Sequence, residues 1–413
     1  TEDTITVSQV VESLTGSVTI TADDIDDDNV AIVNIGANIS GDDVTITAED
    51  ANSDSELISV TSATVNTWGS TTFEANDGTL DVDAGVTAAD AITFNAGDTL
   101  SVKGGNAILA EHAITFNDAL TIDEDGTAVT IDSDDADVVF FGTVNTDGSN
   151  VSLVVNAESG LADFNDFVGT TFAIDDLTIS GEDVEFNGNV TAQDIDMSAS
   201  DNVLLATDVV LTADDNVLFG ANTNVDGAQS LTIDATTNSE LGNVGDITPL
   251  TTLEVNAATA TLHGDITVAG EVNFAAVPDV DLGDNVSVTS TAAGAVTFGT
   301  DVDGPFALQI TNQSGAVTVE SVGANDRLDS LSLTSQTGAV TVNGASNTTG
   351  PIDIDALDTA TIGGAMASAA GDIDVTGGDV TTTDTITTTG DINIDAFTND
   401  ATIGADADVE SAA

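Results

Sequence analysis

The sequence predicts an all-β fold, a parallel β-helix or β-solenoid, with about three short strands in each coil of about 19–23 residues. Three observations support this prediction. The 413 residues include 38 glycines but only 4 prolines, and the apolar residues are mostly Val, Ile, Leu and Ala, which suits short strands and many turns. Apolar and polar residues alternate with the period of two that marks a strand. Short phrases recur about every 21 residues, as in repeat architectures.

One phrase marks a single side of successive coils. It reads GAVTFG, GAVTVE and GAVTVN, opening at Gly294, Gly315 and Gly338. In each copy the third and fifth residues are apolar and the fourth is threonine, so the apolar side chains share one buried face. Copies that take the same place in their coils stack at the strand spacing of about 4.8 Å. We expect right-handed winding, the hand that parallel crossovers prefer.

A second phrase marks another side of the same coils. It reads GPIDI, GDIDV and GDINI, opening at Gly350, Gly371 and Gly390. Its first copy begins about half a coil after Gly338, so we expect the two phrases on different faces. The segment AITFN also occurs twice, one coil apart, at residues 91–95 and 113–117. The main alternative is a string of β-sandwich modules, which would repeat near 100 residues, and we find no similarity at that interval.

The coil unit is easier to phase in some regions than in others. Residues 1–90 form a less regular β region, which we interpret as a cap or an assembly segment, and residues 91–413 carry the solenoid repeats. At about 21 residues per coil, the whole chain corresponds to nearly 20 coils. Strand phase begins at Ile5 and continues to Ile403 without a capping helix. Uncapped coils expose strand edges, so we expect head-to-tail or lateral association of copies.

The charge of the chain excludes several classes of partner. Asp and Glu number 72, and only Lys103 and Arg327 oppose them, which gives a formal net charge of −70. Nucleic acids and anionic membrane surfaces are recognised through basic residues, so neither is an expected partner. No apolar run approaches the roughly 20 residues that span a bilayer. Such acidity suits an exterior rich in salt or divalent ions. We therefore expect an extracellular, cell-surface location.

The sequence favours a protein without catalytic activity. A polysaccharide lyase would need cationic neutralisation of its substrate, and Lys103 and Arg327 lie too many coils apart to share a site. A hydrolase needs only two carboxylates, which an acidic chain offers everywhere. Trp68 is the one tryptophan and tyrosine is absent, so few aromatics could hold sugars. His112 and His263 are also several coils apart, and we interpret both as turn or solvent-facing residues.

Three acidic segments are candidate cation sites. They read DDIDDD, DEDG and DSDDAD, and they bunch carboxylates in turn-like settings. Calcium binds six to eight oxygen ligands of this kind. The alternative is diffuse screening of a salt-adapted surface by many cations. The candidate calcium ligands are Asp24, Asp26, Asp28, Asp123, Asp125, Asp132, Asp134, Asp135 and Asp137.

The second half of the chain resembles a known repeat family. The segments ITPLTTLEV (residues 247–255), GDITV, GAVTFG and LDSLSLTSQTGAVTVNG are similar to the haemagglutinin-like repeats of large secreted bacterial exoproteins. The resemblance covers roughly residues 231–403 and concerns the style of the repeat. It implies a right-handed β-helical filament, exported by two-partner secretion, that acts as an adhesin or a surface structure.

Together these observations predict a non-catalytic extracellular structural protein. We expect a stiff acidic β-solenoid rod that builds a surface layer, a filament or an adhesin stalk, with calcium screening or bridging its carboxylates. Its expected partners are other copies of itself and cell-surface polysaccharide. The alternative function is a β-helix that binds or degrades polysaccharide. A groove with aligned acids and an exposed aromatic residue would favour that alternative.

Overall fold

The computed structural model describes residues 3–24, 31–50, 56–61, 64–123, 127–398, 401–403 and 409–411. Within these ranges every regular element is a β-strand, and the strands pair in parallel with partners one coil away. The predicted β-solenoid is therefore confirmed. It has about 17 coils, fewer than the nearly 20 predicted. No helix in the described part of the chain is long and apolar enough to cross a membrane.

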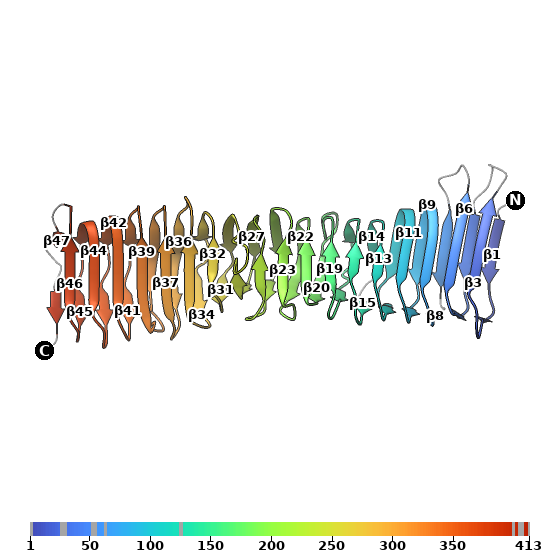
Figure 1. Cartoon of the computed structure of the whole chain (residues 1–413), viewed down its shortest axis with the longest axis horizontal. Helices are drawn as coiled ribbons and strands as arrows, with labels where there is room; N and C mark the ends of the chain where they lie inside the picture. The colour runs from blue at the N-terminus through green and yellow to red at the C-terminus, as the bar shows by residue number, and fades with distance from the viewer. Residues whose placement is uncertain are drawn as a thin grey trace. The chain divides into compact units, whose positions relative to one another are not determined.

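The chain divides into two compact units, Thr1–Thr207 and Asp208–Ala413. In Figure 1 the strands of each unit lie side by side in chain order. Three strand ladders follow one another around each coil, as predicted, and they define three faces of the unit. The faces of the first unit are A, B and C, and those of the second are D, E and F. Long strands bend at a corner and contribute to two faces.

Face A of the first unit contains β2 (Val11–Glu12), β5 (Ile39–Gly41), β8 (Val65–Thr67), β10 (Val86–Ala88), β12 (Ala107–Ala110), β15 (Val129–Ser133), β18 (Leu153–Asn156), β20 (Ile174–Ser180) and β22 (Val190–Met197). Face B contains β3 (Val18–Asp24), β6 (Val44–Asp50), β9 (Thr71–Asp83), β11 (Ile92–Lys103), β13 (Ile114–Phe116), β16 (Val138–Phe140), β19 (Leu161–Phe164), β21 (Asp183–Phe186) and β23 (Asn202–Leu205). Face C contains β1 (Asp3–Val7), β4 (Ala31–Ile35), β7 (Leu57–Thr61), β14 (Leu120–Asp123), β17 (Val144–Thr146) and parts of β9, β11, β20 and β22.

Face D of the second unit contains β24 (Val209–Ala213), β27 (Ser230–Ala235), β30 (Thr252–Asn256), β33 (Val272–Phe274), β36 (Val296–Asp303), β38 (Val317–Val322), β40 (Val340–Val342), β42 (Ile352–Ile362), β44 (Ile373–Thr382) and β47 (Ala401–Ile403). Face E contains β25 (Asn216–Phe219), β28 (Asn238–Leu241), β31 (Thr259–Leu262), β34 (Asp279–Leu282), β41 (Ser346–Thr348), β43 (Met366–Ser368), β45 (Ile386–Thr388), β48 (Val409–Ser411) and parts of β36 and β38. Face F contains β26 (Asn224–Asp226), β29 (Asn243–Val244), β32 (Ile266–Val268), β35 (Val286–Ser290), β37 (Ala307–Asn312), β39 (Ser330–Ser335), β46 (Ile392–Ala396) and parts of β42 and β44.

The two repeated phrases occupy the predicted places. The GAVT copies lie in register on face D, where Val317 pairs with Val296 on one side and Val340 on the other. The copies of the second phrase lie in register on face F, where Ile373 pairs with Ile352 and Ile392. The alternating apolar residues point inward because every second side chain of a strand faces the same way.

A stack of phenylalanine rings fills the core behind face B. Successive coils contribute one buried ring each at the same strand position, so neighbouring centroids lie 4.8–5.4 Å apart. Rings at this distance make favourable stacking contacts in addition to the apolar area they bury. The stacked residues are Phe73, Phe94, Phe116, Phe140, Phe164 and Phe186.

Coil length varies more than the sequence predicts. Asp3 pairs with Ala31, a step of 28 residues, whereas Ile174 pairs with Ala192, a step of 18. The strands stay in parallel register in both cases, so the turns absorb the difference. The long coils lie in the first 90 residues, where the period is hard to recognise, and they account for the smaller number of coils.

Candidate functional site: a corner groove and two carboxylate clusters

A groove runs along the corner between faces A and B in the first unit. Four successive coils line it where β8, β10, β12 and β15 end, and its volume is about 370 Å³. Ala88, Ala89 and Ala110 are small enough to leave the groove open, while Trp68 and the carboxylate of Glu111 also line it. Each coil contributes the residues at the end of its face A strand, so the in-register stacking of turns creates the groove.

Trp68 is the one large aromatic side chain in the groove lining, and 54% of its surface is exposed. It follows Thr67, which is buried and closes β8. The next residue, Gly69, must be a glycine because a Cβ there would overlap the backbone carbonyl oxygen of Asp42. The tight turn therefore holds the indole at the groove with its ring accessible to solvent. An exposed indole can stack on an apolar ring or attract a cation.

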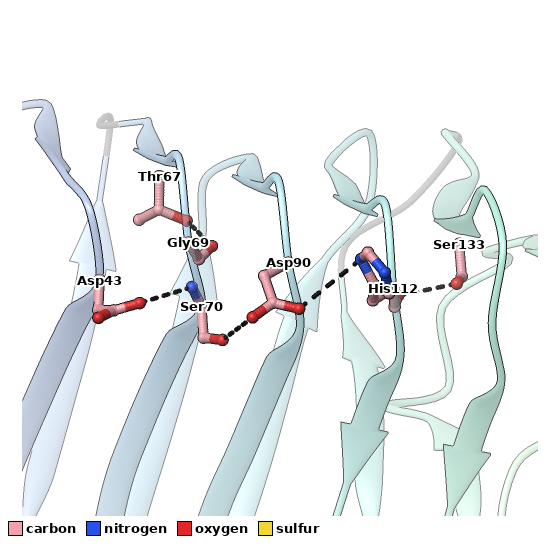
Figure 2. Close-up of polar contacts among 7 residues, drawn as sticks. All are labelled: Asp43, Thr67, Gly69, Ser70, Asp90, His112 and Ser133. Atoms are coloured by element: carbon pink, nitrogen blue, oxygen red, sulfur yellow. Dashed lines mark hydrogen bonds and ion pairs between the residues drawn. The ribbon is translucent and has the colours of Figure 1, made fainter.

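A chain of polar contacts ties five coils together beside this groove (Figure 2). The backbone N–H of Ser70 donates to Asp43 Oδ1 at 3.0 Å, and its hydroxyl donates to Asp90 Oδ2 at 2.8 Å. Asp90 Oδ1 lies 3.6 Å from His112 Nδ1, a pair that is ionic when the imidazole is protonated. Ser133 Oγ donates to the carbonyl oxygen of His112 at 2.8 Å. These contacts pin one turn to the next and give His112 a structural role.

His263 makes a comparable contact in the second unit. Its Nε2 lies 2.8 Å from Glu240 Oε1, in the preceding coil. Both histidines therefore contact a carboxylate of a neighbouring coil. They lie in different units, and each has a partner that accounts for its position.

Three carboxylates meet at one end of the corner groove. Asp132, Asp134 and Glu158 each offer one oxygen, and these oxygens lie within 4.8 Å of one another. Asn156 donates to Asp132 Oδ1 at 2.9 Å. Burial raises the pKa of the Asp132 carboxyl, the negative charge of Asp134 raises it further, and the Asn156 hydrogen bond partly offsets both effects. Three hard oxygens could hold a calcium ion, with the rest of its six to eight ligands coming from water or backbone. We call this group the groove cluster.

A second cluster lies on face C and consists of Asp81, Asp83 and Asp123, again with one oxygen each within 4.8 Å. Asp123 pairs in register with Lys103, and Lys103 follows Val102, which pairs with Val82 just before Asp83. The chain's only lysine is therefore placed between two of these aspartates. Its ammonium group supplies positive charge to this column, so the groove cluster is the better place for a metal ion.

The structure brings some of the predicted calcium ligands together and separates others. Asp132 and Asp134 belong to the groove cluster, and Asp123 belongs to the face C cluster. Asp135 and Asp137 lie in the exposed turn after β15, where Asp137 Oδ1 accepts a hydrogen bond from the Leu161 N–H at 2.9 Å.

The other predicted ligands carry no description of their carboxylates. Asp24 closes β3, and its side chain lies outside the described part, as do Asp26, Asp28 and Asp125 entirely. The sequence analysis missed Glu158, Asp81 and Asp83. These three lie one or two coils away from their partners, so only the register of the ladders reveals their proximity. A carboxylate one coil length after DSDDAD was the available signal for Glu158.

Comparison of the chain with protein-family models, curated protein sequences and solved structures finds no match.

Proposed function

We propose that the chain is a non-catalytic extracellular structural protein. In this proposal it is a stiff acidic β-solenoid rod of a surface layer, filament or adhesin stalk, and cations, above all calcium, screen or bridge its carboxylates. The observation that carries the proposal is the stacking of acidic residues on the outside of the coils. A parallel solenoid repeats each side-chain position once per coil, so a repeated acidic position becomes a column of charge.

Several columns of this kind are present. Asp353 pairs with Asp374 on face F, and Asp279 and Asp281 pair with Asp301 and Asp303 on face E. Burial raises the pKa of the Asp353 carboxyl, and the charge of Asp374 raises it further. Two unit charges about 4.8 Å apart repel by about 1 kcal/mol even in bulk water. Repulsion along many columns opposes folding unless cations gather there, and a salt-rich exterior supplies them.

A second candidate function is binding of a polysaccharide. The exposed indole of Trp68 in a groove with Glu111 and Asp134 favours it, because a sugar ring can stack on the indole while carboxylates accept its hydroxyls. Trp68 is also the only tryptophan, so its fluorescence reports on the groove directly. A saturable change in emission on adding a neutral polysaccharide, lost in Trp68→Ala, would support this second function.

The cation proposal is tested by thermal unfolding of the full chain in chelator at low ionic strength, followed by addition of millimolar calcium. We expect calcium to raise the midpoint temperature more than sodium at matched ionic strength. In Asp134→Asn the calcium-specific increment should shrink, because one oxygen charge of the groove cluster is lost. Asp135→Asn, one residue further along in the exposed turn, is the matched control and should behave as the unsubstituted chain.

The outcomes separate two forms of the proposal. Equal increments from sodium and calcium would show diffuse screening without a specific site. A midpoint that responds to neither ion would contradict the proposal that cations stabilise the coils.

A further inference from the structure

A four-residue loop is extruded from the solenoid three times, with the same local sequence. The segments read VGTTFAI, VGDITPL and VGANDRL and begin at Val168, Val244 and Val322. They are spaced by 76 and 78 residues, more than three coils. In each segment the first two residues and the last are buried, and the residues between them are largely exposed. The repetition marks the loops as a designed feature of the chain rather than irregular insertions.

The strand pairing of the second unit shows how these loops leave the coil. Val244 pairs with Ile266, and Leu250 pairs with Val268 in the same coil. Two positions of one coil therefore face six positions of the other, and residues 246–249 project from face F. Val322 and Leu328 repeat this geometry against Ser346 and Thr348 on face E.

Each loop of the second unit is held from below by the preceding coil. The backbone N–H of Gly245, whose φ is +69°, donates to the carbonyl oxygen of Val225 at 2.7 Å. Asp226 is only 3% exposed, and its Oδ1 accepts the backbone N–H groups of Ile247 and Thr248 at 3.0 and 2.9 Å. These bonds fix the loop rigidly, so its tip is presented in one conformation.

The two loops of this unit differ at one informative position. In the later loop Asp303 makes the same backbone contacts, and the side chain of Asn325 donates to its Oδ2 at 2.9 Å. In the earlier loop Ile247 stands at the place of Asn325, and the buried Oδ2 of Asp226 has no hydrogen-bond partner. Leaving a buried carboxylate oxygen unpaired costs stability. The gain is an isoleucine with 77% of its surface exposed, which suggests that the tip contacts something apolar.

The same unit offers an acceptor for an apolar tip. A groove of about 410 Å³ lies at the corner between faces D and E. Its lining includes Ala213, Ala235, Ala258, Ala276 and Pro278. Loop 246–249 leaves face F, the one face that does not border this groove. The loop of one copy therefore cannot fill its own groove, whereas a neighbouring copy can supply it.

We propose that the Ile247 tip of one copy docks into the alanine-lined groove of a second copy. The inference rests on the proposed structural function and names one lateral contact for it. Because a loop meets a different surface on its partner, the contact is heterologous and can propagate from copy to copy. Asp246 on the loop and Asp214 and Asp234 at the groove bring like charges together. The association therefore strengthens with salt or calcium, which screen that repulsion.

The test uses sedimentation velocity of the full chain over a range of concentrations in calcium-containing buffer, with the thermal midpoint measured in parallel. The unsubstituted chain should associate. Ile247→Asn should weaken association by about tenfold or more, since a largely exposed isoleucine no longer becomes buried. The same variant should raise the midpoint temperature, because the new amide can donate to Asp226 as Asn325 does to Asp303. Loss of association together with higher stability cannot come from misfolding.

A second pair of variants tests the groove. Ala258→Trp fills it and should also prevent association, whereas Ala324→Trp adds the same side chain to the exposed tip of the later loop and should leave association unchanged. The proposal is overturned if the unsubstituted chain stays monomeric, or if Ile247→Asn or Ala258→Trp associates as strongly as the unsubstituted chain. Each of these results is independent of whether calcium stabilises the coils, which the thermal experiment in chelator decides separately.

Discussion

At the scale of single residues, the fold depends on positions that tolerate no side chain. Gly169 begins the first extruded loop with a φ of +71°, and its N–H donates to the carbonyl oxygen of Val144 at 2.7 Å. A Cβ at this position would overlap the carbonyl oxygen of Thr191 in the next coil. Both the left-handed backbone and the close approach of two coils therefore require glycine here.

We expect Gly169→Ala to destabilise the first unit by at least about 1–2 kcal/mol, the usual cost of a left-handed conformation for an alanine. The overlap with the neighbouring coil adds to that loss. Gly85→Ala is the matched control, because a Cβ there would meet its nearest neighbour, the oxygen of Ala107, at an ordinary 3.5 Å. Urea unfolding followed by circular dichroism should show a lower midpoint for Gly169→Ala alone. Equal midpoints for the two variants would contradict this account of the loop.

At the scale of the strand, stability comes from side chains that repeat once per coil. Phe140 and Phe141 are adjacent in sequence but face opposite sides of the chain. The ring of Phe140 is buried and lies 4.9 Å from Phe116 and 4.8 Å from Phe164, whereas Phe141 is about half exposed. One residue therefore belongs to the core stack and the next to the surface.

We expect Phe140→Ala to cost about 3–5 kcal/mol, the range for removing a buried aromatic side chain. The cavity would interrupt the stack between two neighbours that remain in place. Phe141→Ala should change stability by about 0.5 kcal/mol or less, as surface substitutions usually do. Chemical unfolding of both variants under the same conditions measures the difference. A small effect at Phe140 would show that the stack contributes little beyond filling space.

Strands are also the scale at which the sequence was most informative. The alternation around Val317 and Ile373 predicted the faces and their registers, because each coil repeats the same buried positions. The extruded loops were not predicted, since four extra residues inside a strand break the period of about 21. Comparing the chain with itself at an interval of 76–78 residues would have found them. Glu158 could not be assigned to Asp132 from sequence, because their contact depends on the length of the intervening coil.

At the scale of the whole molecule, the decisive quantity is the net charge of −70. Most of the carboxylates with a shifted pKa are shifted in one direction. Burial is the largest cause in each of these, and in most of them neighbouring carboxylates add to it. The carboxyls with a raised pKa are Asp132, Asp163, Asp175, Asp281, Asp301 and Asp353. Asp147 shifts the opposite way, because its pKa is lowered by hydrogen bonds from Ser149.

These shifts predict that mild acid stabilises the protein. A carboxyl whose pKa is raised above its usual value of 3.8 binds a proton more tightly in the folded chain than in the unfolded chain. Its contribution to stability is greatest below the unfolded pKa and is lost as the pH rises through the folded pKa. The thermal midpoint in chelator, at constant ionic strength, should therefore rise as the pH falls from 7 toward about 5, above the isoelectric point near 4.1.

Calcium and protons compete for the same oxygens, which gives the pH prediction an internal check. Near pH 7 the carboxylates are ionised and calcium should raise the midpoint most. Toward pH 5 the raised carboxyls begin to bind protons, so the same calcium concentration should add less. Melting curves at four combinations of pH and calcium measure both effects at once. A midpoint that falls on acidification in chelator would show that hydrogen-bonded carboxylates such as Asp147 outweigh the charge columns.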